Sequence, residues 1–142
     1  MKTLQDYLNA NMIEWLDHNN LKYKVADITL DKGILIILFN DNFCLKIYDR
    51  FGHGFGVNIN VAEKYNESIY DNDSFSLTWA YKYLDTVETA SFDNRTEKQY
   101  LKNLPNLIND LTNIIPKLNR MNSLEWTKMK EWITKEANKL FT

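Results

Sequence analysis

Four short segments between residues 21 and 61 have the side-chain pattern of β-strands, and turn residues separate them. In residues 55–61 apolar side chains alternate with small or amide ones, so one face of that strand is apolar. Residues 34–39 are a continuous apolar run, which is typical of a central strand. Turn residues at 31–33 and 40–42 join neighbouring strands. The pattern predicts an antiparallel β-meander of about four strands.

Apolar stripes with helical spacing lie on both sides of this region. They occupy residues 4–16, 100–118 and 124–140. We therefore predict an α+β fold in which N-terminal and C-terminal helices pack on one face of the sheet. That face carries Leu45, Ile47, Val57 and Ile59. Because the chain has 142 residues and 44% of them are apolar, it can fill one core, so we predict a single domain over residues 1–142.

The ends and interruptions of these helices can also be predicted. Thr96 and Gln99 fit a capping box, and the last helix should begin near residues 122–123. Pro105 and Pro116 lie inside the second stripe. Since proline removes a helical hydrogen bond and collides with the preceding turn, we expect a break or kink there.

Residues 74–84 fit two periods at once. Five apolar side chains alternate as they would in a strand, namely Phe75, Leu77, Trp79, Tyr81 and Tyr83. Three of these, Phe75, Trp79 and Tyr83, are also spaced four residues apart, as on one side of a helix. Acidic and capping residues at 71–74 favour a helix, because they complement a helix N-terminus. We predict a helix over residues 74–84 with these three aromatic side chains on its buried side, whereas a strand would be a fifth member of the sheet.

Charge and cysteine content exclude several classes of function. The formal net charge of −2 argues against a general binder of nucleic acid or anionic membranes, because both need a basic surface. One cysteine and two histidines cannot supply an internal disulfide or a four-ligand zinc site. The longest apolar run is far shorter than the about 20 residues of a membrane span. We expect a cytoplasmic protein with no cofactor, no metal and no membrane association.

No motif in the chain indicates a defined catalytic chemistry. The glycine cluster at residues 52–56 precedes a predicted strand, which favours a turn over a phosphate-binding loop. His53 within it could act as a general acid or base, with Asp49 as its only chain neighbour of matching role. Nothing near Cys44 would lower the pKa of its thiol, so a structural role is favoured. We assign no catalytic residue.

An excess of acidic residues between Glu63 and Glu97, eight against three basic ones, is the most informative functional signal. Aromatic residues are interleaved with them, and protein interfaces often combine aromatic anchors with a charged rim. The leading hypothesis is a small protein-binding domain, and its most specific form is a bacterial immunity or antitoxin-like protein that neutralises a basic toxin domain. The partner would be a basic protein surface, not nucleic acid. The candidate partner-binding residues are Glu63, Glu67, Asp71, Asp73, Asp85, Glu88 and Asp93.

A small-molecule-binding or enzymatic domain is the alternative hypothesis. Its pocket would lie between the less apolar face of the sheet and a covering helix, with a histidine at the rim. The candidate ligand-binding residues are Lys46, Tyr48, His53, Asn58 and Asn60.

Overall fold

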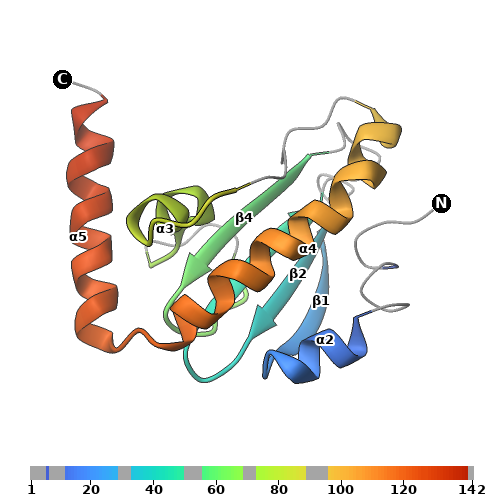
Figure 1. Cartoon of the computed structure of the whole chain (residues 1–142), viewed down its shortest axis with the longest axis horizontal. Coiled ribbons are helices and arrows are strands. Elements are labelled where there is room, and N and C mark those ends of the chain that lie inside the picture. Colours follow the sequence, from blue (N-terminus) through green and yellow to red (C-terminus); the bar gives the residue numbers. More distant parts are fainter. Residues whose placement is uncertain are drawn as a thin grey trace.

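An antiparallel sheet of five strands, with helices on one face, forms the described part of the chain (Figure 1). The structure is a computed structural model that describes residues 6, 12–28, 33–49, 56–68, 73–88 and 96–140. The helices are α2 (Ile13–His18), α3 (Leu77–Tyr83), α4 (Glu97–Asn119) and α5 (Ser123–Lys139). The strands are β1 (Lys22–Ile28), β2 (Gly33–Phe39), β3 (Cys44–Asp49), β4 (Val57–Ala62) and β5 (Phe75–Ser76). This is the predicted α+β class, with one more strand than the about four that the sequence indicates.

The strands lie in the sheet in the order of the chain, from β1 to β5, and each neighbouring pair is antiparallel. The register places Ile47 between Ile36 of β2 and Ile59 of β4, so these three side chains share one face. Asn40 shapes the turn between β2 and β3, because its Oδ1 accepts a hydrogen bond from the backbone N–H of Asn42 at 2.8 Å. The predicted meander is confirmed.

The main core lies between the predicted face of the sheet and the helices. Side chains of that face form one buried cluster with residues of α2, α3, α4 and α5. Figure 1 shows α4 crossing the sheet diagonally. Ile36 and Leu38 of β2 face this core, while Leu35 and Ile37 belong to a second cluster. The run at 34–39 is therefore buried on both faces, as a central strand should be.

Helix α4 continues without a break through Pro105 and Pro116, so the predicted break does not occur. Both prolines are exposed. The carbonyl groups that lose their helical partners one turn earlier therefore lie on the solvent side, where water can bind them. The predicted start is confirmed, because Thr96 Oγ1 accepts a hydrogen bond from the backbone N–H of Gln99 at 3.2 Å.

The helix predicted over residues 74–84 begins later, at Leu77. Phe75 and Ser76 form β5 and pair with the outer edge of β4. The prediction that Phe75 lies in the helix is therefore wrong. Pairing with β4 satisfies the backbone groups of these two residues, which local capping signals could not anticipate.

The buried side of α3 also differs from the prediction. Its fully buried side chains are Leu77, Ala80 and Tyr81. Trp79 and Tyr83 are only partly buried and pack against Trp132 of α5, with ring centroids 6.3 Å and 5.4 Å apart. These aromatic rings fill the junction between α3 and α5.

Helix α5 begins with a capping box of Asn122 and Glu125, close to the predicted start. It stands at one end of the molecule beside α3 (Figure 1). Its buried side chains are Trp126, Met129 and Ile133. Leu124 and Leu140, the first and last residues of the predicted apolar stripe, are 61% and 72% exposed, so the prediction that they face inward is wrong. Leu124 precedes Trp126 by two residues, which is about half a helical turn, and so it points the opposite way.

Candidate functional site

Four residues of the predicted ligand pocket lie on the sheet face opposite the helices, namely Lys46, Tyr48, Asn58 and Asn60. Lys46 is buried there, and its Nζ donates to Asn66 Oδ1 at 2.8 Å and to Ser68 O at 2.7 Å. Both acceptors belong to residues 63–68, which follow β4 and which we call the strap. The ammonium group of Lys46 is therefore engaged in holding the strap against the sheet.

The strap crosses several strands of the sheet. The ring of Tyr65 lies 4.4 Å from that of Phe39 on β2. Glu67 forms an ion pair with Lys24 on β1 and accepts a hydrogen bond from the Tyr65 hydroxyl. These hydrogen bonds, the one from Lys24 first, lower the pKa of Glu67. Cys44 is fully buried in the second cluster on this face, as expected for a structural cysteine.

The other candidate ligand-binding residues do not form one site in the described part of the chain. Asn58 is exposed and Asn60 is partly exposed. The Tyr48 ring packs against Gly33, where a Cβ atom would overlap it. His53 lies outside the described residues. The small-molecule hypothesis therefore stays a prediction, and the strap takes the place on this face that we had expected a helix to occupy.

Asp49, considered above as a partner for His53, has a structural role. Its side chain is buried at the end of β3 and accepts a hydrogen bond from Tyr100 Oη at 2.7 Å. Tyr100 lies in the first turn of α4, so this bond ties the helix to the sheet. Hydrogen bonds to charged groups contribute about 1.5–3 kcal/mol.

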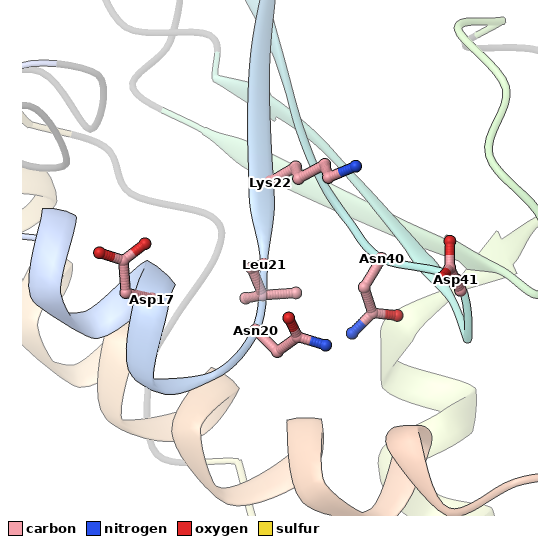
Figure 2. Close-up of a pocket in the computed structure, with 6 residues that line it drawn as sticks. All are labelled: Asp17, Asn20, Leu21, Lys22, Asn40 and Asp41. Atoms are coloured by element: carbon pink, nitrogen blue, oxygen red, sulfur yellow. The ribbon is translucent and has the colours of Figure 1, made fainter.

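A pocket of about 240 Å³ lies where α2 meets β1 and the β2–β3 turn (Figure 2). Its lining residues are Asp17, Asn20, Leu21, Lys22, Asn40 and Asp41. In Figure 2 the amides of Asn20 and Asn40 point toward each other, and the Asp17 carboxylate points away from them. Asn40 Nδ2 also donates to Asn119 Oδ1 at 2.8 Å, so this amide helps to join the turn to α4. The six lining residues include no nucleophile and no matched acid–base pair.

Three of the predicted partner-binding carboxylates are engaged inside the molecule. Glu63 accepts a hydrogen bond from Ser123 Oγ at 2.7 Å, and Glu67 is held by Lys24. Asp73 lies 4.0 Å from Lys130 Nζ. A second pocket, of about 280 Å³, is lined by Glu63, Lys64, Tyr65, Asn66, Asp73 and Lys130. Two further candidates lie outside the described residues, namely Asp71 and Asp93.

A hydrogen-bonded turn follows α3, and we call residues 85–88 the acidic turn. Asp85 has a positive φ of 53°. Its N–H donates to Lys82 O at 3.3 Å, and the N–H of Thr86 donates to Tyr81 O at 2.9 Å. These two bonds form a Schellman motif, which ends the helix and satisfies its last carbonyl groups.

Two side chains of the acidic turn are exposed to solvent. Asp85 is exposed and has no polar side-chain partner among the described residues. Val87 is 75% exposed. Lys117 Nζ of α4 donates a hydrogen bond to Leu84 O at 2.8 Å, so α4 also holds the backbone at the start of the turn. The acidic turn thus presents a free carboxylate and an apolar side chain on a fixed backbone.

Glu88 closes the acidic turn and is partly buried. Burial, as the larger cause, and the charge of Asp110 raise the pKa of Glu88, while a hydrogen bond with Thr78 and the charge of Lys82 act in the opposite direction. Asp110 is fully buried in α4. The charge of this buried residue therefore acts on Glu88 from α4.

Val87 and Asp110 were missed by the sequence analysis. A single valine in a turn has no periodic signal. Asp110, by contrast, interrupts the apolar stripe of α4 beside Leu107 and Leu111, and a charged residue at a core position often marks a site. The sequence therefore contained a signal that could have identified Asp110.

The described ranges contain neither a metal-binding cluster nor a membrane-spanning helix. Within them, no three His, Cys, Asp or Glu residues are grouped so that they could hold a metal ion. None of the helices there has both the length and the apolar character needed to cross a membrane. No protein-family model, no curated protein and no solved structure matches the chain.

Proposed function

We propose that this protein acts by binding another protein, and that its binding surface combines the acidic turn with the aromatic side chains at the α3–α5 junction. One observation carries the proposal. The exposed Asp85 and Val87 follow directly on α3, whose Trp79 and Tyr83 rings, together with Trp132, are only partly buried. Partly exposed Trp and Tyr side chains beside unpaired charge are the composition of protein interfaces.

The charge of this surface favours a basic partner. Glu63, Glu67 and Asp73 have partners inside the molecule, whereas Asp85 has none among the described residues. Opposite charge on a partner would speed association and orient it. Because the Schellman motif and Lys117 already fix the turn, little conformational freedom would be lost on binding.

The most specific form of this proposal is a bacterial immunity or antitoxin-like protein that neutralises a basic toxin domain in the cytoplasm. Its support is the small size of the chain, its net charge of −2 and the acidic segment from Glu63 to Glu97. A protein that works by occluding a partner needs a surface and no catalytic group.

Selection from a random peptide library displayed on phage tests the proposal without a known partner. We expect enriched peptides to combine lysine or arginine with apolar residues, and to bind the double variant Asp85→Lys with Val87→Asp about tenfold more weakly, which corresponds to about 1.4 kcal/mol. Their association rates should fall as salt is added. The control is Asp73→Lys at another exposed carboxylate of the segment. It changes the net charge by about +2, against about +1 for the double variant, and it should still leave affinity nearly unchanged.

Two outcomes would contradict the proposal. One is the absence of any enriched peptide. The other is a set of peptides whose binding the Asp73→Lys variant weakens as much as the double variant does, because charge alone and not this surface would then explain the binding.

A further inference from the structure

The cavity of about 280 Å³ lies where the strap meets α5. Four of its lining residues belong to the strap, one precedes β5 and one belongs to α5, namely Glu63, Lys64, Tyr65, Asn66, Asp73 and Lys130. The hydrogen bond from Ser123 Oγ to Glu63 fastens the strap to the first turn of α5. Lys64, Tyr65 and Asp73 are exposed, so a small ligand can enter the cavity from solvent.

Asn66 places an amide of fixed orientation in the wall of this cavity. Its Oδ1 accepts hydrogen bonds from Lys46 Nζ at 2.8 Å and from the backbone N–H of Ser68 at 3.2 Å. Because only the oxygen of the amide can accept, its Nδ2 group is turned away from both donors. This Nδ2 group has no hydrogen-bond partner among the described residues. The fold therefore holds one N–H donor in place and unused.

Two lysines of the same cavity also have unused N–H donors. Lys130 Nζ lies 4.0 Å from Asp73 Oδ1, which is longer than a hydrogen bond. Lys64 has neither a hydrogen bond nor an ion pair with any other described residue. Both ammonium groups are thus available to an acceptor that enters the cavity.

The two carboxylates of the cavity do not use up these donors. Glu63 is bound to Ser123, and the positive end of the α5 dipole also stabilises its charge there. The side chain of Asp73 is 84% exposed, so water screens its charge. The unused groups that line the cavity are therefore mainly N–H donors, and two of them carry a positive charge.

We infer that this cavity binds a phosphate group through Lys64, Asn66 and Lys130. A phosphate monoester has three acceptor oxygens and a charge of about −1.5 to −2 at pH 7, so it matches one amide and two ammonium groups. A carboxylate has only two oxygens and one charge. The cavity exceeds the size of a phosphate group and leaves room for a small organic substituent beside the exposed Tyr65 ring. No residue of the acidic turn lines it, so this site is separate from the proposed protein-binding surface.

Titration with inorganic phosphate and with glycerol 3-phosphate, followed by NMR, tests the inference. We expect a saturable change in the chemical shifts of the Asn66 side-chain NH₂ group with both probes. Tighter binding of glycerol 3-phosphate would identify an organic monoester as the ligand, whereas equal affinities would identify the phosphate group alone. Sodium chloride at matched ionic strength is the control for screening. No saturable change, or an equal change with chloride, would overturn the inference.

Lysine variants test which ammonium groups hold the phosphate. Lys64→Met and Lys130→Met should each weaken phosphate binding about tenfold, because each removes a charged donor. Lys128→Met is the matched control, since Lys128 is exposed on α5 half a turn from Lys130 and does not line the cavity. It removes the same charge and should weaken binding about twofold or less. An equal loss in the control would overturn the inference, because charge alone would then explain binding.

Asp73→Asn gives a test in the opposite direction. Asp73 competes with the phosphate group for Lys130, so its neutralisation should strengthen phosphate binding about threefold. Asp17→Asn makes the same change at an exposed carboxylate of α2, on the helical side of the sheet, and should have a smaller effect. Equal effects of the two variants would contradict the placement of the phosphate beside Lys130. Thermal unfolding of each variant confirms that it is folded.

Discussion

At residue 88 the fold holds a carboxylate where burial and the charge of Asp110 both oppose ionisation. The pKa of Glu88 is therefore higher in the folded than in the unfolded state. For such an acid, the stabilising contribution is complete below the unfolded pKa and is lost as pH rises through the folded pKa. We expect Glu88→Gln to have a higher Tm than the parent at neutral pH, and the difference to vanish below the ordinary value of 4.5. Thermal unfolding over a pH series measures this, and a parent that equals the variant at neutral pH would contradict it.

The backbone conformation of Asp85 allows a quantitative prediction about stability. Its φ of 53° lies in the left-handed region, which glycine enters without a steric penalty and alanine does not. Asp85→Gly and Asp85→Ala both remove the carboxylate, so comparing them isolates the backbone. We expect the glycine variant to be about 1 kcal/mol more stable in urea unfolding. Equal stabilities would show that the turn can relax out of the Schellman geometry.

At the scale of elements, the strap is held by two lysines of different burial, and they should contribute differently. Lys46→Met leaves Asn66 Oδ1 and Ser68 O without their buried donor, so we expect a loss of about 2 kcal/mol. Lys24→Met removes an exposed ion pair and should cost about 1 kcal/mol or less. Urea unfolding gives the free energies.

Cys44 reports independently on the strap, because it is the only cysteine of the chain and is fully buried beside Asn66. Its reaction with a thiol reagent under native conditions should be faster in Lys46→Met than in Lys24→Met. If both variants protect the thiol as well as the parent does, Lys46 does not hold the strap.

Element boundaries show where local signals compete with long-range ones. The segment 74–84 has capping residues and helical spacing, and a helix does form over most of it. Phe75 and Ser76 leave that helix because the edge of β4 offers backbone partners. Pro105 and Pro116 do not end α4, since both are exposed and the carbonyl groups that they leave unpaired lie on the solvent side, where water can bind them. In each case the outcome depends on what lies beside the segment in space.

For the molecule as a whole, the assignment of the sheet faces has a direct test. Val57 is buried in the main core, and its neighbour Asn58 is exposed on the other face. Val57→Asp would bury an unpaired charge and should lower the free energy of unfolding by about 3–5 kcal/mol, while Asn58→Asp should change it by about 0.5 kcal/mol or less. Thermal and urea unfolding of the two variants measure this. Equal losses would mean that the faces are reversed.

Only part of the candidate site could be predicted from the sequence. The acidic segment could be recognised by counting, and Asp85 and Glu88 were named from it. A count of charges cannot show which carboxylates are paired inside the fold. Glu63 and Asp73 have partners on α5, and Glu67 has one on β1, all of them distant in the chain. Nor can such a count show that the charge of Asp110 acts on Glu88.

The sequence by itself determined the α+β class, the antiparallel meander, the face of the sheet that becomes the core and the starts of α4 and α5. These follow from side-chain periodicity and turn residues, which act between near neighbours in the chain. Only the tertiary structure decided that the strap covers the second face, that β5 adds to the sheet and that Asp85 has no polar side-chain partner among the described residues. Such outcomes depend on which groups satisfy one another across distant segments, because each buried polar group takes whichever partner the packed chain brings within reach.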